Sequence, residues 1–379
     1  MNLSQAIKEQ AHGLGFALVG ITTGEPLPHG EIFNAWLDSG RHGQMAYLAT
    51  QRSRECRLNP SKLLAGCHSV LVLGMRYPKP LSPPMEPQTN QGPYGKIAAY
   101  AWGEDYHRTL PEKLKQLVGF IESQVGHPVP SRWYTDTGPL LERELAQRAG
   151  LGWIGRNTCL INPSQGSYFL LAEVLLGIEL EPDEPFTYDR CGTCQRCIAA
   201  CPTGCILPDR TLDASRCISY LTIELKEAIP VSLRPLLDGW VFGCDVCQQV
   251  CPWNRFALPQ AGAAYGNSLV EPAPDLLSEI TLAPSEFNQK YRHHPISRAK
   301  RRGYLRNVSV ALGNTHLPAV VAALGTALQG DAEPLVRAHA AWALGQIGTS
   351  LARQALEDAA GSEMHLQVKL EIQSALRED

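Results

Sequence analysis

Cysteine is the residue type whose spacing in this chain points most directly to chemistry. The chain has 12 cysteines, and nine of them lie between Cys191 and Cys251. Within this stretch, Cys191, Cys194, Cys197 and Cys201 form the pattern C-x2-C-x2-C-x3-C, followed by Pro202. In bacterial ferredoxins the same spacing binds a [4Fe–4S] cluster, and its fourth cysteine ligates a second cluster. The pattern therefore predicts iron–sulfur chemistry.

A second, divergent half of this pattern follows. It consists of Cys217 and then Cys244-x2-Cys247-x3-Cys251 before Pro252. Because the cysteine before each proline is carried to the other cluster, the ligand sets are expected to be exchanged. One cluster would take Cys191, Cys194, Cys197 and Cys251, and the other would take Cys201, Cys217, Cys244 and Cys247. Two adjacent clusters carry electrons one at a time, so the reaction that they feed should lie elsewhere in the chain.

Zinc is the competing interpretation of these cysteines. Zinc sites usually pair two C-x2-C units, with four ligands for each ion. A triple repeat that ends in Cys-Pro, present twice, is harder to explain in this way, and the spacing favours clusters. The remaining cysteines are expected to be small buried thiols, and they are Cys56, Cys67, Cys159 and Cys205.

Length and composition limit the class of protein. The chain has 379 residues, of which 44% are hydrophobic and 19% charged, with a net charge of −3. These values suggest two to four globular domains and exclude a wholly disordered or fibrous chain. No run of about 18 apolar residues is present, and the N-terminus lacks a signal-peptide pattern. We therefore expect a cytoplasmic protein without a membrane partner.

The elements that must position the chemistry fall into three parts. Residues 1–180 mix helical and strand patterns and predict an α/β domain. Short apolar runs at 16–21, 70–73 and 168–176 indicate buried strands, residues 3–12 a helix, and Pro78–Pro93 a loop or an active-site flap. Residues 139–149 also predict a helix, with Pro139 at its first position and Gly150 at its end.

Asp136 lies just before this predicted helix and has two interpretations. Aspartate before a helix is usually an N-cap, and the sequence alone favours that role. A carboxyl group desolvated against a large apolar cofactor would instead keep its proton near neutral pH and could serve as a proton donor.

Two nearby motifs are weaker. Gly150-x-Gly152-x-x-Gly155 matches the dinucleotide-binding fingerprint, but it follows a helix rather than a strand, so we interpret it as a helix-ending turn. Asp105-Tyr106-His107 matches the start of a D-x-H motif in which histidine ligates cobalt. Leu110 stands where that motif requires glycine. A cobalt ligand is therefore not supported, and His107 is expected to be an ordinary polar side chain.

The second part, residues 181–258, holds the cysteines behind an acidic linker at 179–189. The third part, residues 259–379, begins with a loose Gly/Ala/Pro stretch and becomes helical. Ala-Leu pairs recur there at a spacing of 32, at positions 311–312, 343–344 and 375–376. This period predicts stacked helix pairs of the HEAT type, and the alternative is an unrelated bundle in which the pairs coincide. Gly313 and Gly345 follow two of the pairs, as helix ends would.

A cationic run overlaps the third part. Between residues 287 and 330 the chain carries seven Lys or Arg residues and no Asp or Glu. Such a run is usually a solvated face, but in a chain with a net negative charge it favours contact with phosphates. The candidate nucleic-acid contacts are Arg298, Lys300, Arg301, Arg302 and Arg306.

Several blocks of the sequence together resemble the epoxyqueuosine reductase family. They are RLNPSKLLAGCHSVLVL at 57–73, GKIAAYAWGEDYH at 95–107 and YTDTGPLLERELAQRAGLGWIGRNTCLI at 134–161, together with the double cysteine run and the C-terminal helical repeats. The resemblance implies a cobalamin-dependent iron–sulfur oxidoreductase, related to reductive dehalogenases. It would reduce epoxyqueuosine to queuosine in the anticodon loop of tRNA, the last step of queuosine synthesis.

The resemblance also implies a fold and a set of site residues. The fold is an α+β multidomain chain with a nitroreductase-like cobalamin domain, a ferredoxin-like domain with two [4Fe–4S] clusters and HEAT-like repeats. Asp136 matches the proton donor of the family, whose cobalamin has no protein ligand below cobalt. The blocks that contact the corrin correspond to Arg57, Tyr100, Asn157, Ser219, Lys226 and the backbone of Cys244, Asp245, Val246 and Cys247.

The electron donor would be a protein such as a flavodoxin or ferredoxin. Two competing functions remain open from the sequence. A cobalamin enzyme that reduces a small organic molecule would share the first two parts of the chain, and a ferredoxin-type electron carrier would bind clusters but no corrin.

Overall fold

The computed structural model describes residues 2–80, 93–257 and 270–377. The chain forms two compact units, each assembled from separate segments. The first unit comprises residues 1–81, 103–215 and 246–269, and the second comprises 82–102, 216–245 and 270–379. The cysteine-rich segment therefore contributes to both units. None of the described helices is long and apolar enough to span a membrane.

An antiparallel sheet organises the first unit. Its strand order is β1 (Leu18–Thr23), β2 (Ser69–Arg76), β7 (Phe169–Leu176) and β4 (Ser131–Tyr134). The three apolar runs identified in the sequence thus form strands, as predicted, although the first strand begins two residues later than the run at 16–21. Every residue of β2 except Arg76 is buried, as expected for a strand inside a sheet.

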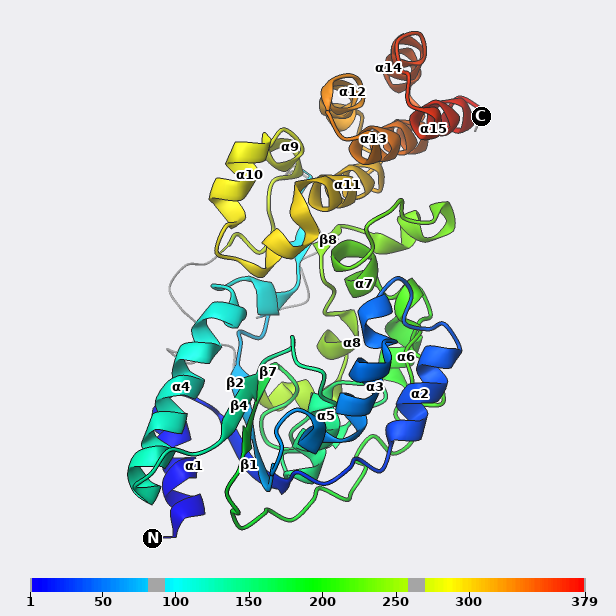
Figure 1. The fold of residues 1–379 in the computed structure, drawn as a ribbon. Coiled ribbons are helices and arrows are strands. Elements are labelled where there is room, and N and C mark those ends of the chain that lie inside the picture. The colour runs from blue at the N-terminus through cyan, green and yellow to red at the C-terminus, as the bar shows by residue number, and fades with distance from the viewer. Residues whose placement is uncertain (1, 81–92, 258–269, 378–379) are drawn as a thin grey trace. The chain divides into compact units, whose positions relative to one another are not determined.

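Helices cover both faces of this sheet (Figure 1). On one side α1 (Leu3–Gly13) packs against α4 (Tyr106–Val125), and α4 contacts β4 and β7. On the other side α5 (Glu142–Arg148) packs against β2 and β7, where Leu145 joins Val72 and Leu175 in the core. Because alternate residues of a strand point to opposite faces, Glu173 of β7 points to the same side as Leu175, toward α5.

The helix predicted from Pro139 is shorter than expected. It begins at Glu142, and its N-cap is Leu141, which makes no side-chain capping bond. Leu140 is buried in the core ahead of the helix. The predicted turn at the helix end is confirmed, because Gly150 has a φ of +76°, which favours glycine.

Shorter elements complete the first unit. Helices α2 (Gly30–Asp38) and α3 (Gln51–Leu58) lie between β1 and β2 in the chain, and β5 (Trp153–Ile154) pairs with β6 (Leu160–Ile161). Two short helices follow in the cysteine-rich segment, α6 (Arg196–Ala200) and α8 (Val246–Gln249). The acidic stretch at 179–189 has no regular secondary structure.

The second unit is mainly helical. A short parallel pair, β3 (Lys96–Ile97) and β8 (Trp240–Phe242), contacts α7 (Ile218–Ile223) and α11 (Lys300–Gly313). The other helices of the unit are α9 (Leu276–Ile280), α10 (Pro284–Tyr291), α12 (Val321–Gly330), α13 (Pro334–Ile347), α14 (Ser350–Ala360) and α15 (Leu366–Ala375).

The repeat predicted at a spacing of 32 places equivalent helices side by side. Helix α13 packs against both α11 and α15 (Figure 1). Gly313 ends α11, as predicted, but Gly345 lies inside α13, so the prediction of a helix end there is wrong. Both glycines allow close approach instead. A Cβ at Gly313 would lie 2.8 Å from Ala343, and one at Gly345 would lie 2.8 Å from Ala375.

Two sequence predictions fall largely or partly outside the described residues. Most of the proline-rich segment Pro78–Pro93 and the first part of the Gly/Ala/Pro stretch that opens the third part lie in the gaps at 81–92 and 258–269.

Candidate active site and cluster-binding cysteines

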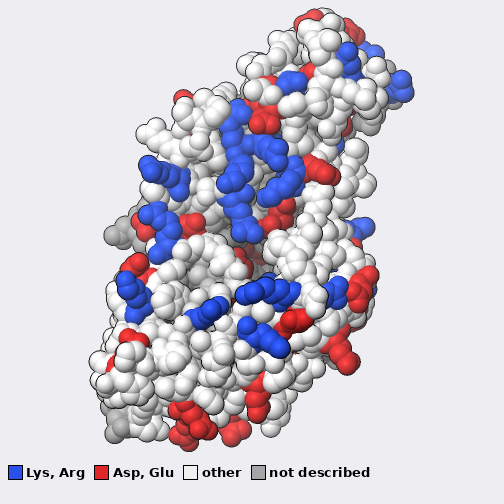
Figure 2. Space-filling view, in the orientation of Figure 1, with Lys and Arg blue, Asp and Glu red and all other residues white. Residues whose placement is uncertain are grey.

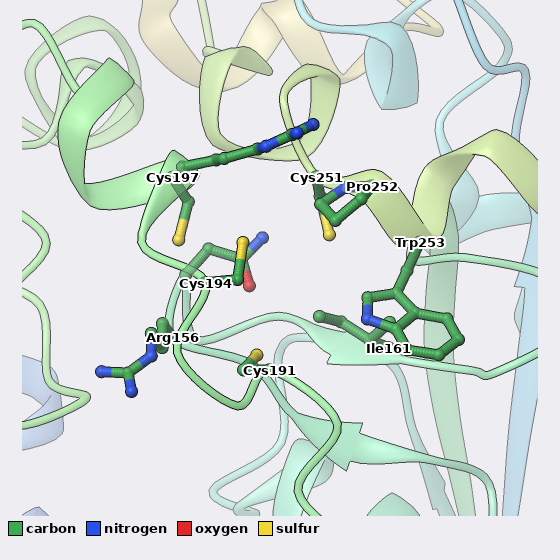
Figure 3. A pocket seen from close by; sticks show the side chains of 10 residues that line it. Arg156, Ile161, Cys191, Cys194, Cys197, Cys251, Pro252 and Trp253 are labelled. Atoms are coloured by element: carbon green, nitrogen blue, oxygen red, sulfur yellow. The ribbon is translucent and has the colours of Figure 1, made fainter.

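One predicted cluster set lies together in the first unit. A cavity there is lined by Cys191, Cys194, Cys197 and Cys251. Figure 3 shows that the four sulfur atoms point into a common space. This is the ligand set that the exchanged assignment predicts, although Cys251 lies far from the other three in the sequence.

Local structure explains how these thiols are presented. The Cys194 amide donates to the Cys191 carbonyl at 3.0 Å, which closes a turn around Gly192, and Cys197 lies in α6. The indole N–H of Trp153, which is buried, donates to the Cys191 sulfur at 3.4 Å. Hydrogen bonds to cluster sulfurs are one way in which proteins tune reduction potentials.

The chemistry of this donor set fits a cationic metal cluster. Burial raises the pKa of the Cys251 thiol to about 11, and it also raises the pKa of Cys197. Such thiols ionise when they bind a metal, because a ligating thiol must be deprotonated. Over the described ranges, no three His, Cys, Asp or Glu side chains lie close enough together to hold a single metal ion, so the four sulfurs are not arranged around one ion.

The second predicted cluster set is divided between the units. Cys201 and Cys247 belong to the first unit, and Cys217 and Cys244 belong to the second, so this set stays a prediction. Cys205, expected to be a packed thiol, is buried, and its sulfur lies 3.4 Å from that of Cys201. Hydrogen bonding from Cys205 lowers the pKa of Cys201 to about 5.

Asp136 of the first unit has a left-handed backbone conformation. It has a φ of +59°, and its amide N–H donates to Glu142 Oε1 at 2.7 Å. The interpretation of Asp136 as an N-cap is therefore wrong, because α5 begins six residues later. The Asp136 side chain is 56% exposed, and its Oδ2 accepts a hydrogen bond from the Tyr106 hydroxyl at 2.9 Å.

His107 connects Asp136 to a second carboxylate. Its Nδ1 lies 2.7 Å from Asp105 Oδ1, and its Nε2 lies 3.4 Å from Asp136 Oδ2. Burial opposes the charge on the ring, but the two neighbouring carboxylates prevail and raise the pKa of His107 to about 9. This pKa favours a protonated ring at neutral pH, held between Asp105 and Asp136.

Sequence reasoning missed this role of Tyr106 and His107. The signal was present in Asp105, which caps α4 by accepting the His107 amide at 3.0 Å. That cap places both side chains in the first turn of the helix. Their proximity to Asp136 depends on the packing of α4 against β4, which ends two residues before Asp136, and the sequence does not reveal that packing.

Arg57 and Asn157, two of the predicted corrin contacts, are both buried in the first unit. Burial lowers the pKa of Arg57, while the negative charges of Glu142 and Asp136 oppose that change. The Asn157 side chain donates to the Cys247 carbonyl at 3.4 Å and lines the cysteine cavity.

Other predicted corrin contacts lie in the second unit. Ser219 belongs to α7, and the Tyr100 ring lies 6.1 Å from that of Phe242. The Asp245 carboxylate is buried and accepts the Ala99 amide at 2.7 Å, and burial raises its pKa to about 7. Burial lowers the pKa of Lys226, which donates to the Ile223 carbonyl at 3.1 Å. Contact of these residues with a corrin stays a prediction.

The predicted phosphate-binding residues separate into two groups. Figure 2 shows Lys and Arg side chains gathered over the region that α10 and α11 occupy in Figure 1. Arg298, Lys300 and Arg302 are exposed, although Arg298 pairs with Glu224 at 2.6 Å. Arg301 forms an ion pair with Asp331 that leaves its side chain only 16% exposed.

Arg306 cannot contact phosphate in this structure, and that prediction is wrong. Its side chain is fully buried and donates to the backbone carbonyls of Leu221, Leu225 and Glu227. The Arg306 guanidinium was predicted to contact nucleic acid, but it donates hydrogen bonds within the second unit instead.

Comparison with known proteins agrees with this arrangement. Family models match at residues 57–137 (epoxyqueuosine reductase QueG, DUF1730), 190–254 (4Fe-4S double cluster binding domain) and 303–377 (HEAT repeats). The epoxyqueuosine reductase of Cyclobacterium marinum is 41% identical over 80% of this chain and 95% of that protein. The one from Pseudomonas aeruginosa is 40% identical over 91% and 95%. The chain belongs to the epoxyqueuosine reductase family.

Solved structures of this family extend over the whole chain. A crystal structure of epoxyqueuosine reductase with an epoxyqueuosine-modified tRNA-Tyr stem loop has a TM-score of 0.89 and 30% identity, covering 100% of this chain and 99% of that one. The epoxyqueuosine reductase of Streptococcus thermophilus has a TM-score of 0.85 at 29% identity, with 99% and 98% coverage. The comparisons confirm the predicted family, the double-cluster segment and the HEAT repeats, and they favour iron–sulfur clusters over zinc.

Proposed function

We propose that this protein reduces epoxyqueuosine to queuosine in the anticodon loop of tRNA, the last step of queuosine synthesis. The observation that carries the proposal is the match to epoxyqueuosine reductases at 40–41% identity over 80–91% of the chain. The related structure that holds a modified tRNA stem loop, with a TM-score of 0.89, supports the same substrate. The proposed compartment is the cytoplasm.

Each of the three parts of the chain would have its own role in this reaction. Residues 1–180 would form the nitroreductase-like cobalamin domain, residues 181–258 would bind two [4Fe–4S] clusters, and residues 259–379 would contact tRNA. When bound, cobalamin would supply the reducing chemistry, fed with electrons from the clusters and, before them, from a flavodoxin or ferredoxin.

The environment of His107 makes this side chain unsuited to bind the metal of a cofactor. Both ring nitrogens face carboxylates, Nδ1 toward Asp105 and Nε2 toward Asp136. An imidazolium has no free lone pair with which to bind a metal. The residues proposed to hold the corrin are Arg57, Tyr100, Asn157, Ser219, Lys226 and the backbone of 244–247.

Asp136 would act as the proton donor. Its carboxyl group is half exposed and therefore accessible to a substrate base, while Tyr106 and His107 hold Oδ2 from two directions. Protonation of the departing epoxide oxygen stabilises the negative charge that develops on it, which is general acid catalysis. Tyr106 and His107 would be positioning residues that keep the carboxyl group in one orientation.

The cationic surface would hold the tRNA backbone. Bases of a single-stranded loop can be splayed into a pocket at low cost, since they are already partly unstacked. Arg298, Lys300 and Arg302 are the exposed candidates for phosphate contact. Arg301 contributes to a groove lined by Arg292, His293 and Lys300, but its ion pair with Asp331 reduces its availability.

The decisive test is a reaction under anaerobic conditions. The full chain, loaded with clusters and cobalamin, is incubated with a low-potential reductant and tRNA that carries epoxyqueuosine, and the nucleosides are then analysed by mass. We expect the loss of one oxygen atom from the modified nucleoside. An unchanged nucleoside with a fully loaded protein would contradict the proposal, and turnover of a small organic epoxide or halide without tRNA would support the competing small-molecule reductase. Loaded clusters without corrin would support the electron carrier.

A further inference from the structure

The first unit contains a buried carboxyl group that its fold does not explain. Glu173 lies in the middle of β7, paired with Val72 on one side and Tyr134 on the other, and its side chain is fully buried. Neither of its carboxyl oxygens has a hydrogen-bond partner among the described residues. A buried carboxylate without a partner is costly, so such a group normally keeps its proton.

Glu173 points toward the site of Asp136. It shares a strand face with Leu175, the face that α5 covers, and α5 begins with Glu142. Glu142 in turn accepts the Asp136 amide at 2.7 Å. Burial, followed by the negative charge of Asp136, raises the pKa of Glu142 to about 7. Burial and the charges of Glu142 and Asp136 raise the pKa of Glu173 well above its ordinary value.

The cations near Glu142 and Glu173 come from α3, α4 and α5. Arg57 of α3 and Arg143 of α5 oppose the rise in the pKa of Glu142, but burial outweighs them. From α4, His107 contributes its positive charge beside Asp136. None of these cations forms an ion pair with Glu142 or Glu173 in the described part of the chain. The two glutamates are therefore acidic side chains without a cationic partner among the described residues, and we call them the acid pair.

The proposed reaction needs a source for a second proton. Converting an epoxide to an alkene breaks two C–O bonds, consumes two electrons and two protons, and releases the oxygen as water. A low-potential donor supplies the electrons. As the proposed donor, Asp136 can supply only one proton at a time, and a bound substrate base would cover its exposed side. We propose that Glu142 and Glu173 store the second proton and deliver it to Asp136 after the first transfer.

The proton balance of this step is simple. Asp136 gives its proton to the departing oxygen and becomes a carboxylate, and Glu142 then reprotonates it. Glu173 reloads Glu142, and solvent restores the pair after the product leaves. This role rests on the proposed function, because it assigns the second proton of that reaction.

The first measurement needs no substrate. Infrared spectra of the full chain with its clusters report protonated carboxyl groups directly. Glu173→Gln should remove one protonated-carboxyl signal at neutral pH, and Glu142→Gln should remove one that titrates near pH 7. Glu144→Gln is the matched control, because Glu144 is a buried glutamate of the same helix that accepts hydrogen bonds from His29. If Glu173→Gln leaves every protonated signal in place, Glu173 is ionised and the proposal is overturned.

The second measurement is the pH dependence of a single turnover. The wild-type rate should fall as the pH rises above about 7, because Glu142 must be protonated to donate. Glu142→Gln should lower the rate about 100-fold, at the low end of general acid catalysis, and remove this pH limb. Variants that lose the infrared signals but keep the wild-type rate and profile would show a purely structural role. A wild-type chain that holds both acids but reduces no epoxide would overturn the proposed function instead.

Discussion

Buried ionisable side chains have partners in the C-terminal helices and their contacts, whereas in the Asp136 region some of them have none among the described residues. In the helices they are paired: Arg306 donates to three carbonyls, and Arg234 pairs with Glu371 at 2.5 Å. Arg337 donates to Glu363 and lowers its pKa to about 2. In the Asp136 region, by contrast, the pKa of Glu142 is raised to about 7, and Glu173 has no described partner.

This difference separates charges that stabilise a fold from charges that a reaction requires. Buried polar groups are nearly always hydrogen-bonded when their role is structural, because an unpaired group costs free energy. Strongly perturbed carboxyl groups gathered at one place are typical of functional sites. The comparison therefore supports the proposal that the Asp136 region is the site of chemistry and that the helical repeats serve as scaffold and surface.

Asp136→Asn should have the largest effect on activity. The amide keeps the size of the side chain but cannot donate the proton, so turnover should fall by about 10²- to 10⁴-fold. Cobalamin and iron content should stay at the wild-type level, since the cluster cysteines are untouched. Near-normal turnover with full cofactor content would show that Asp136 is not the proton donor. It would also weaken the contrast between the Asp136 region and the C-terminal helices.

Arg306→Met should have the largest effect on stability. It leaves three buried carbonyl groups without a donor, and each unsatisfied group costs about 1–3 kcal/mol. We expect the free energy of unfolding of the full chain to fall by at least about 3 kcal/mol, measured with chemical denaturant. The control is Arg302→Met, on the same helix but exposed, which should change it by less than about 0.5 kcal/mol. Equal effects of the two substitutions would contradict a structural role for Arg306.

Glu173→Gln should change how stability depends on pH. The folded-state pKa of Glu173 is raised, so its contribution is fully present below the unfolded value of about 4.3 and is lost as the pH rises through the folded pKa. Glutamine stays neutral throughout. The variant should therefore gain stability over the wild type as the pH rises, by up to about 1.4 kcal/mol for each pH unit between the unfolded pKa and the folded pKa, and the difference should level off above the folded pKa. Thermal unfolding across about pH 5 to 9 measures this, and a difference that does not vary with pH would show that Glu173 does not titrate.

Arg302→Ala should have a smaller effect, confined to tRNA binding. Loss of one phosphate contact should weaken binding and reduce the slope of log K against log salt by about 0.7–0.9. Arg301→Ala is the informative partner, because its guanidinium is held by Asp331 and should matter mainly for stability. A salt slope that is unchanged in Arg302→Ala, or reduced more in Arg301→Ala, would contradict the assignment of Arg302 to phosphate contact and of Arg301 to a structural role.

Much of this molecule was predictable because its signals are local. The strands at 70–73 and 168–176 were correct, since continuous apolar runs of that length form buried strands. The repeat was also correct, since stacked helices require the same residues at each period. The helix at Pro139 was predicted three residues too early, and the cap assigned to Asp136 was wrong for the same reason, because neither signal reports a turn with a positive φ.

The sequence by itself determined the family, through the cysteine spacing together with the blocks at 57–73, 95–107 and 134–161, and it predicts the two clusters. Only the tertiary structure decided which charges are available. Arg306 lies in a cationic run but is buried, while Glu173 lies in an apolar strand but is a buried acid beside the site. Whether a charge is paired depends on the packing of elements that are far apart in the chain, such as β4 and β7 or α7 and α11. No local sequence pattern encodes which of these elements pack together.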